Sequence, residues 1–269
     1  MDGPPHFIVS VCCSTAALIS AAHDKRSPAM QELVHCISEF RKTLNAELEI
    51  RLGSATEGTF CPGVAKHVFT QLEHDLIETS LARDSKWHEI VDYFFLNRQG
   101  ETVRTRVEYD SDKMEVKKQH ICKQTRQCLL FFRTEGDTDD EVCKLALSTE
   151  TPVVDLPVSC MPTHIRIKQR RCFRDVRVGK VVWSYELCRT WSGSSRTAVE
   201  QLQLSSEPMY EVEVELVDEG KAYSSCRTDE QIAASLLLKM EMLLGEQGNG
   251  GSGGGTLRLL SSQRVKRRK

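Results

Sequence analysis

The sequence predicts an α+β protein, mainly antiparallel β, whose strands close into a barrel with helices at both ends of the chain. From residue 87 to residue 216 apolar residues recur with a period of two, which is typical of strands. Before and after this region they recur at helical spacing. About nine strands are expected, and closing them into a barrel removes the unpaired edges of an open sheet.

The N-terminal part of this pattern predicts two helices and one strand. The first helix is expected to run to Lys42, because Ser27 is a good N-cap and Pro28 suits the first helical position. Residues 47–52 form the first expected strand. A second amphipathic helix is expected from residue 62 onward, where Pro-Gly precedes apolar residues at helical spacing.

The remaining strands are separated by glycine and proline residues that are typical of turns. They are expected at residues 88–96, 101–109, 113–121, 127–133, 141–149, 163–171, 180–188 and 209–217. A last amphipathic helix is expected over residues 229–244, and Gly245 ends it.

Composition divides the chain into three expected parts, which are an N-terminal extension (1–26), the barrel domain (27–245), and a glycine-rich linker with a disordered basic tail (246–269). The whole chain of 269 residues has a formal charge of −2, which gives no global sign of nucleic-acid binding. Residues 256–269, however, hold six Lys or Arg residues and no acid. The tail is therefore expected to be a nuclear-import signal or an electrostatic tether for RNA. The alternative is a solvated tail without function.

Cysteine usage and hydropathy predict an intracellular protein that does not enter a membrane. The eleven cysteines include no CxxC pair and no Cys/His spacing of the zinc type, so they are read as buried thiols in a reducing compartment. Residues 7–22 are apolar but too short to span a bilayer. The residues before them lack the Lys or Arg with which a secretory signal begins.

Two strands alternate acidic with aliphatic residues, and together they predict a surface of five carboxylates, because alternate side chains of a strand share a face. If this surface is enclosed, it needs a cation to offset the repulsion. Oxygen ligands alone suit Mg²⁺ or Mn²⁺. The alternative is a pair of solvated strand faces. The five acids are Glu47, Glu49, Glu211, Glu213 and Glu215.

Basic residues follow the same alternation on the strands between these two. The clearest case is residues 164–170, in which Arg166, Lys168 and Arg170 alternate with isoleucines. Further charged residues that lie opposite aliphatic ones are Arg104, Arg106, Lys117, Lys144, Glu150 and Glu186.

The helices bear on which row faces inward. An ordinary barrel would keep the aliphatic rows inside. The apolar sides of the flanking helices offer these rows another partner, so we expect the charged rows to face the lumen and to bind a polyanion with its metal. Neither a glycine-rich phosphate loop nor a Rossmann fingerprint is present.

Several short segments occur in a specific order between residues 27 and 244. They are Glu47-Leu48-Glu49, Phe60-Cys61-Pro62-Gly63-Val64, Val91-Asp92-Tyr93-Phe94-Phe95, Arg166-Ile167-Lys168-Gln169-Arg170 and Glu211-Val212-Glu213-Val214-Glu215. Together they resemble the tunnel-type RNA triphosphatases of fungi and protozoa, which take the first step of mRNA capping. The resemblance implies an eight-stranded antiparallel tunnel with a hydrophilic lumen.

The resemblance also implies roles. The enzyme would hydrolyse the γ-phosphate from the 5′-triphosphate end of nascent mRNA, and NTPs in vitro. Glu47, Glu49 and Glu215 would bind Mg²⁺ or Mn²⁺, and Glu150 and Glu213 would position the attacking water. The residues that would line the triphosphate path are Arg104, Lys117, Arg166, Lys168 and Arg170, with Arg106, Lys144, Glu186 and Glu211 as further substrate contacts.

One strand departs from the family pattern. The family carries Arg, Asp and Thr at alternate positions where this chain has Ser184, Glu186 and Cys188. Either the register differs from our reading, or this wall of the tunnel is rebuilt.

Two other functions remain open. Related tunnel enzymes hydrolyse inorganic tri- or polyphosphate or thiamine triphosphate, and Arg51 lies where their first motif often has a lysine. A non-catalytic barrel that binds a polyanion is the second. For the capping function the expected partners are triphosphate RNA, NTPs and a guanylyltransferase, with no DNA, and the expected location is the nucleus.

Overall fold

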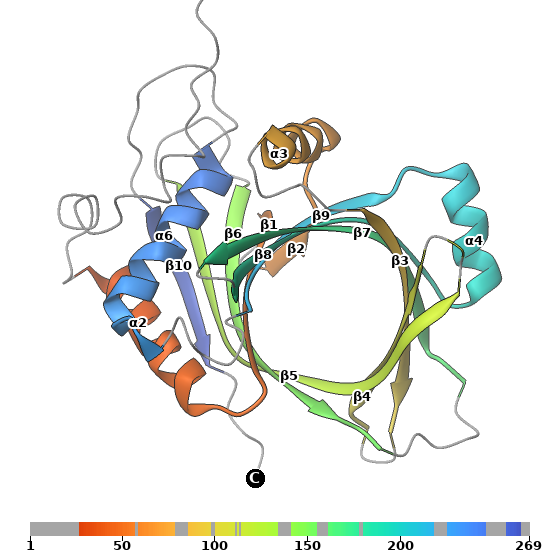
Figure 1. Ribbon diagram of the computed structural model, residues 1–269, viewed down its shortest axis with the longest axis horizontal. Coiled ribbons are helices and arrows are strands. Elements are labelled where there is room, and N and C mark those ends of the chain that lie inside the picture. The colour runs from red at the N-terminus through yellow and green to blue at the C-terminus, as the bar shows by residue number, and fades with distance from the viewer. Residues whose placement is uncertain are drawn as a thin grey trace, which may run out of the picture.

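The computed structural model describes residues 27–56, 59–78, 86–97, 100–110, 112, 114–133, 141–154, 161–177, 180–217, 225–245 and 257–264. In this part of the chain eight antiparallel strands close a ring in the order β5-β4-β3-β7-β8-β9-β1-β6, because β6 pairs with both β1 and β5 (Figure 1). The expected closed barrel is confirmed. The strands are β1 (Ala46–Thr56), β2 (Thr59–Pro62), β3 (Trp87–Leu96), β4 (Thr102–Tyr109), β5 (Glu115–Arg133), β6 (Glu141–Pro152), β7 (His164–Arg177), β8 (Lys180–Gly193), β9 (Met209–Leu216) and β10 (Leu257–Arg264).

Helices lie outside the ring. Those in the described residues are α2 (Pro28–Lys42), α3 (Lys66–Glu78), α4 (Arg196–Ser205) and α6 (Asp229–Gly245). The first helix starts as predicted, since the Ser27 side chain accepts a hydrogen bond from the Met30 amide at 3.2 Å. The helices α2 and α6 pack on one another beside β1, β5 and β6, whereas α4 lies against β7 and β8 on the far side of the ring (Figure 1).

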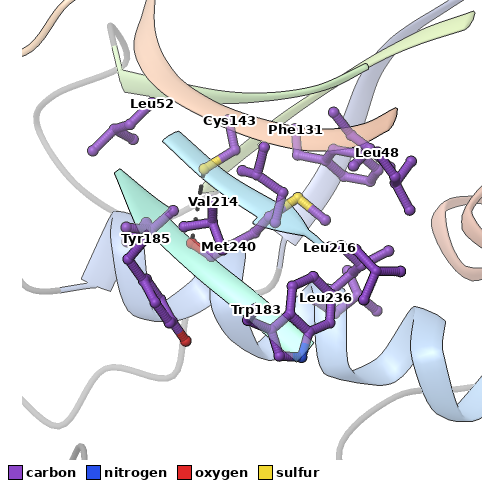
Figure 2. Packing of buried hydrophobic residues seen from close by; sticks show 14 of the residues in the cluster. Leu48, Leu52, Phe131, Cys143, Trp183, Tyr185, Val214, Leu216, Leu236 and Met240 are labelled. Atoms are coloured by element: carbon purple, nitrogen blue, oxygen red, sulfur yellow. Dashed lines mark hydrogen bonds between the residues drawn. The ribbon is translucent and has the colours of Figure 1, made fainter. Parts of the chain in front are cut away.

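The hydrophobic core lies between the barrel wall and the helices, not in the lumen. Leu48 on β1, Trp183 on β8 and Val214 on β9 are fully buried in one cluster with Leu236 and Met240 of α6 (Figure 2). The aliphatic rows therefore face the helices, and the alternating charged rows face the lumen. This confirms the predicted hydrophilic lumen.

Strand β5 corrects the expectation of two separate strands at 113–121 and 127–133. It is continuous over 19 residues, with a shift in its register to β6 between Thr125 and Gln127. A bulge of this kind bends a strand without ending it. The long strand can thus pair with β4 in its first half and with β10 in its second half.

Two short elements were not predicted, and one helix starts later than expected. Pro62, where the second helix was expected to begin, is the last residue of β2, and α3 begins only at Lys66. Gly63 between them has a φ of 112°, a conformation that favours glycine. Helix α4 was not predicted, and the Ser195 side chain caps it by accepting a hydrogen bond from the Ala198 amide at 3.2 Å.

The expected disordered tail is wrong for residues 257–264. These residues form β10, which pairs antiparallel with β5 from Leu257 opposite Arg133 to Arg264 opposite Gln127. Strand β4 covers the same edge of β5 only up to Cys122. The rest of that edge would have unpaired backbone groups, and β10 satisfies them.

The expected N-terminal extension and glycine-rich linker lie outside the described residues. Within the described residues, no helix has both the length and the apolar composition that crossing a membrane requires.

Candidate active site in the barrel lumen

Strand register brings the predicted metal ligands to one end of the lumen. Glu49 on β1 lies opposite Glu215 on β9, and Glu47 lies opposite Ser148 on β6, two residues from Glu150. We call this end of the barrel the mouth, because a cavity of about 480 Å³ opens there. Its lining residues are Asn45, Ala46, Glu47, Gln119, His120, Ile121, Glu150, Pro152, Val153 and Glu215.

The acids at the mouth are incompletely neutralised. Burial, together with the charges of Glu47, Glu186 and Glu49, raises the pKa of Glu215 to about 8. Burial and the neighbouring Glu49 raise the pKa of Glu47 to about 7. Both shifts mean that the ionised carboxylates repel each other in a poorly solvated place, where a bound cation would stabilise them.

Deeper in the lumen the balance is reversed. Burial alone would raise the pKa of Glu213, but Arg51 and Lys168 outweigh it and lower that pKa well below the usual range. The Arg51 guanidinium lies 3.3 Å from the Glu213 carboxylate. Glu213 is therefore ionised at neutral pH, whereas the pKa values of Glu47 and Glu215 lie close to neutral pH.

Lys123 on β5 is a lumen residue that the sequence reading missed. Its Nζ forms an ion pair with Glu47 and lies 3.3 Å from Glu49 Oε2. Lys123 would share a face of that strand with Lys117, because they are an even number of residues apart, but the expected strand ended at residue 121. A continuous β5 would have predicted Lys123 as a neighbour of the acids.

Whether these residues suit a metal ion can be judged from their donors. No group of three or more His, Cys, Asp or Glu side chains among the described residues is gathered closely enough to hold a metal in the present conformation. The donor chemistry nevertheless fits Mg²⁺ or Mn²⁺, because Glu47, Glu49 and Glu215 offer oxygen ligands alone. The raised pKa values of Glu47 and Glu215 show that their ionised forms lack sufficient positive charge nearby. Lys123 is the cation now in contact with two of them.

Most of the predicted basic wall lies in the lumen and is already ion-paired. The pairs are Arg104–Glu150 at 2.7 Å, Arg106–Asp92 at 2.8 and 3.1 Å, Lys168–Glu211 at 2.9 Å, and Arg170 with Glu186 at 3.4 Å and Glu108 at 3.7 Å. Asp92 is 1% exposed and was not singled out, although its alternation on β3 could have revealed it.

Arg166 differs from the rest of this wall. Its guanidinium lies over the Phe94 ring, 5.3 Å from the ring centroid. In the described part of the chain, no carboxylate lies within ion-pair distance of it. Arg166 is thus a lumen cation whose charge is available to a ligand.

Two further residues predicted for the basic wall, Lys117 and Lys144, do not belong to the ion-paired row. Lys117 is exposed near the start of β5, opposite Glu108 of β4. Lys144 lies opposite Arg51, and its Nζ lies 5.3 Å from the centroid of the Phe60 ring. Neither lines the cavity that holds Glu47 and Glu215.

Strand β8 pairs with the acid-bearing strand β9. Ser184 lies opposite Glu215, Glu186 opposite Glu213, and Cys188 opposite Glu211. Ser184, Glu186 and Cys188 therefore share the lumen face with the acids of β9.

No family model matches the chain, and no curated protein matches it in sequence. Solved structures do match. The S. pombe RNA triphosphatase Pct1 is 14% identical, with a TM-score of 0.54 over 82% of this chain and 88% of that one. The structure of Pct1 in complex with the Spt5 CTD is 13% identical, with a TM-score of 0.57 over 82% of this chain and 94% of that one.

The RNA triphosphatase domain of the trifunctional mimivirus mRNA capping enzyme is 13% identical, with a TM-score of 0.52 over 81% of this chain and 97% of that domain. Identities this low show a common architecture rather than a common activity. The chain therefore has the tunnel fold of these RNA triphosphatases.

Proposed function

We propose that this chain is a metal-dependent hydrolase that removes the γ-phosphate from the 5′-triphosphate end of RNA, the first step of mRNA capping. One observation carries the proposal, namely that an under-neutralised acid cluster and a row of guanidinium groups face each other inside a closed lumen. Such a lumen suits a polyanion that arrives with a divalent cation. The fold shared with RNA triphosphatases supports the same reaction.

In the proposed site Glu47, Glu49 and Glu215 would hold Mg²⁺ or Mn²⁺, which would supply positive charge to offset that of the γ-phosphate. Glu213 or Glu150, which lie at different depths of the lumen, accepts a hydrogen bond from the attacking water and orients it in line with the γ-phosphorus. As the water oxygen bonds to phosphorus, its proton passes to a carboxylate, and the β–γ bridging oxygen leaves with the diphosphate end.

The basic wall stabilises the negative charge that develops on the leaving end. Arg166 and Arg104 lie on neighbouring parts of the β3–β4–β7 wall, since β3 pairs with both β4 and β7. Guanidinium groups match two phosphate oxygens at once. Ion pairs such as Arg104–Glu150 hold these side chains in position before the substrate arrives.

Phosphate release from γ-labelled triphosphate RNA tests the proposal. We expect release with Mg²⁺ or Mn²⁺ and none with chelator. Glu49→Gln should reduce it by about 100-fold or more, the scale of a lost charge interaction in the transition state. Glu207→Gln is the matched control, because its carboxylate is 71% exposed outside the lumen.

The substrate panel separates the alternatives. Faster hydrolysis of tripolyphosphate, polyphosphate or thiamine triphosphate than of RNA would move the function to another tunnel phosphohydrolase. No hydrolysis of any triphosphate would leave a polyanion-binding barrel, and the proposal would be rejected.

The diphosphate RNA end must next receive a nucleotidyl group, so we propose a guanylyltransferase partner and a nuclear location. The S. pombe relative in fold has been solved in complex with the Spt5 CTD, which is a protein partner of that enzyme. Co-purification with guanylyltransferase activity, and location of the full chain against a chain lacking residues 265–269, test both proposals.

A further inference from the structure

The lumen changes character at its mouth. On β5 and β6, Thr125 lies opposite Ser148 and Lys123 lies opposite Glu150. The next pair in the same row, one step toward the mouth, is Ile121 opposite Pro152. On these two strands a polar layer and a charged layer are thus followed by an apolar one, and Arg104 of β4 lies opposite Ile121 on the other side of β5.

This apolar layer belongs to the cavity at the mouth. Ile121 and Pro152 line it together with Glu47 and Glu215. Ile121 is 8% exposed and Pro152 is exposed, so the layer reaches from the wall into solvent. Two residues along a strand span about 7 Å, so the apolar layer lies about that far outward from Lys123 and Glu150.

Two amide side chains lie at the same rim. Asn45 is exposed and has a φ of 52°, while its carbonyl accepts a hydrogen bond from the Glu150 amide at 2.9 Å. Gln119 lies one step outward from Ile121 on β5. Neither side-chain amide has a hydrogen-bond partner within the described residues. Both remain available to a ligand that enters the cavity.

We propose that the mouth is a nucleoside subsite. It rests on the proposed function and names the part of the substrate that follows the triphosphate. The base packs against Ile121 and Pro152, and Asn45 and Gln119 hydrogen-bond to ribose hydroxyls or base edges. The triphosphate of the same molecule then points inward to Lys123 and the acids.

The chemistry of the layers favours a nucleoside over a purely inorganic ligand. A polyphosphate has no apolar surface, and apolar side chains in its path would only remove its water. A nucleoside has a flat base face that packs on apolar side chains and polar edges that need partners. The cavity of about 480 Å³ is within the range of small-molecule sites. Because every base has such a face, the subsite should accept all four bases.

Kinetics with three substrates test this subsite. Triphosphate RNA, ATP and inorganic tripolyphosphate are compared in Ile121→Ser and in the unchanged protein. We expect KM for RNA and ATP to rise about tenfold, the scale of a lost base contact, and KM for tripolyphosphate to stay the same. Gln119→Ala, at a half-buried position, should shift KM in the same direction by less and serves if Ile121→Ser fails to fold.

The matched control is Val116→Ser. Val116 is an apolar residue of β5 that is 61% exposed and lies on the opposite face of the strand from Ile121. It should change none of the three KM values. An equal rise for tripolyphosphate, or no rise for ATP and RNA, overturns the subsite.

A binding measurement separates this inference from the proposed function. Calorimetric titration of a non-hydrolysable ATP analogue compares Ile121→Ser with the unchanged protein in the absence of turnover. Weaker binding of the analogue, with unchanged binding of tripolyphosphate, supports the subsite even if no substrate is hydrolysed, in which case the proposed function alone fails. Unchanged binding of the analogue overturns the subsite.

Discussion

At the scale of single residues, neighbours on one strand differ because of what faces them. Glu213 and Glu215 are two residues apart on β9 and share the lumen face. Arg51 and Lys168 keep the pKa of Glu213 low, whereas burial and other acids raise the pKa of Glu215. The same residue type can therefore be a fixed anion at one position and, at the next, an acid whose ionised form a cation would stabilise.

The raised pKa of Glu215 predicts how stability depends on pH in the presence of chelator. Its pKa rises from an ordinary 4.5 to about 8 on folding, so the folded state binds the proton more tightly. Its contribution is fully present below about pH 4.5 and is lost as the pH rises through about 8. Thermal unfolding from pH 5 to pH 8 should show falling stability, and Glu215→Gln should flatten this fall.

Glu213 provides the control for that prediction, because folding lowers its pKa instead of raising it. A lowered pKa contributes stability above about pH 4.5 that is lost only as the pH falls. Glu213→Gln should therefore leave the slope between pH 5 and pH 8 unchanged. If Glu215→Gln has as steep a slope as the unchanged protein, Glu215 is not the source of the effect.

Arg166 and Arg170 should separate catalysis from stability. Arg170 is paired with Glu186 and Glu108 and its side chain is 18% exposed, so Arg170→Ala should lower both turnover and the unfolding temperature. Arg166 lies on Phe94 without a described ion pair, so Arg166→Ala should lower turnover and leave stability nearly unchanged.

Turnover and thermal unfolding of both alanine variants, with Arg166→Lys and Arg170→Lys beside them, check these outcomes. The lysine variants should retain more turnover, as they keep the charge and lose the two-oxygen fork. Full activity of Arg166→Ala would exclude that residue from the phosphate path.

At the scale of elements, the long strand β5 joins the two parts of the molecule. Its first half belongs to the barrel wall, where it pairs with β4 and β6. Its second half carries Leu129 and Phe131 into the core beside the helices and accepts β10 on the edge that β4 leaves free. The bulge after Thr125 makes both pairings possible.

Deleting residues 246–269 should therefore lower the unfolding temperature, because it removes β10 and exposes an edge of β5. Light scattering should show self-association through that edge. Hydrolysis of ATP should persist, since the lumen residues lie upstream.

Deleting residues 265–269 alone is the matched control, because it keeps β10. This shorter deletion should leave the unfolding temperature unchanged. Equal stability of both truncated chains would show that β10 does not support the fold.

At the scale of the whole molecule, stability and chemistry are separated by the barrel wall. Buried apolar side chains lie outside it against α2, α3 and α6, and charged side chains lie inside it. Polar substitutions in the lumen can thus change activity at small cost to the core. Core substitutions act on stability without touching the site.

Leu236→Ala should show this separation. Leu236 is 1% exposed in the core, so its truncation should cost about 2–5 kcal/mol of unfolding free energy in urea titrations. Leu204→Ala on α4, 90% exposed, should stay within about 0.5 kcal/mol. A cost no larger for Leu236 than for Leu204 would show that the core does not lie where we place it.

The sequence by itself determined which side chains share a face. Alternation along β1, β7 and β9 placed the charged residues of each strand together, because the strand period follows from backbone geometry. The pairs are Glu47 with Glu49, Arg166 with Lys168, and Glu213 with Glu215. The helix that begins at Pro28 was equally local, since its cap and its apolar spacing lie within one segment.

Only the tertiary structure decided what lies across from each of these faces. Lys123 as the partner of Glu47, Asp92 as the partner of Arg106, and β10 as the partner of β5 all join segments distant in the chain. Such partners depend on strand register and on a bulge that the alternation does not reveal. Local geometry is set by neighbouring residues, whereas register is set by the packing of the whole barrel.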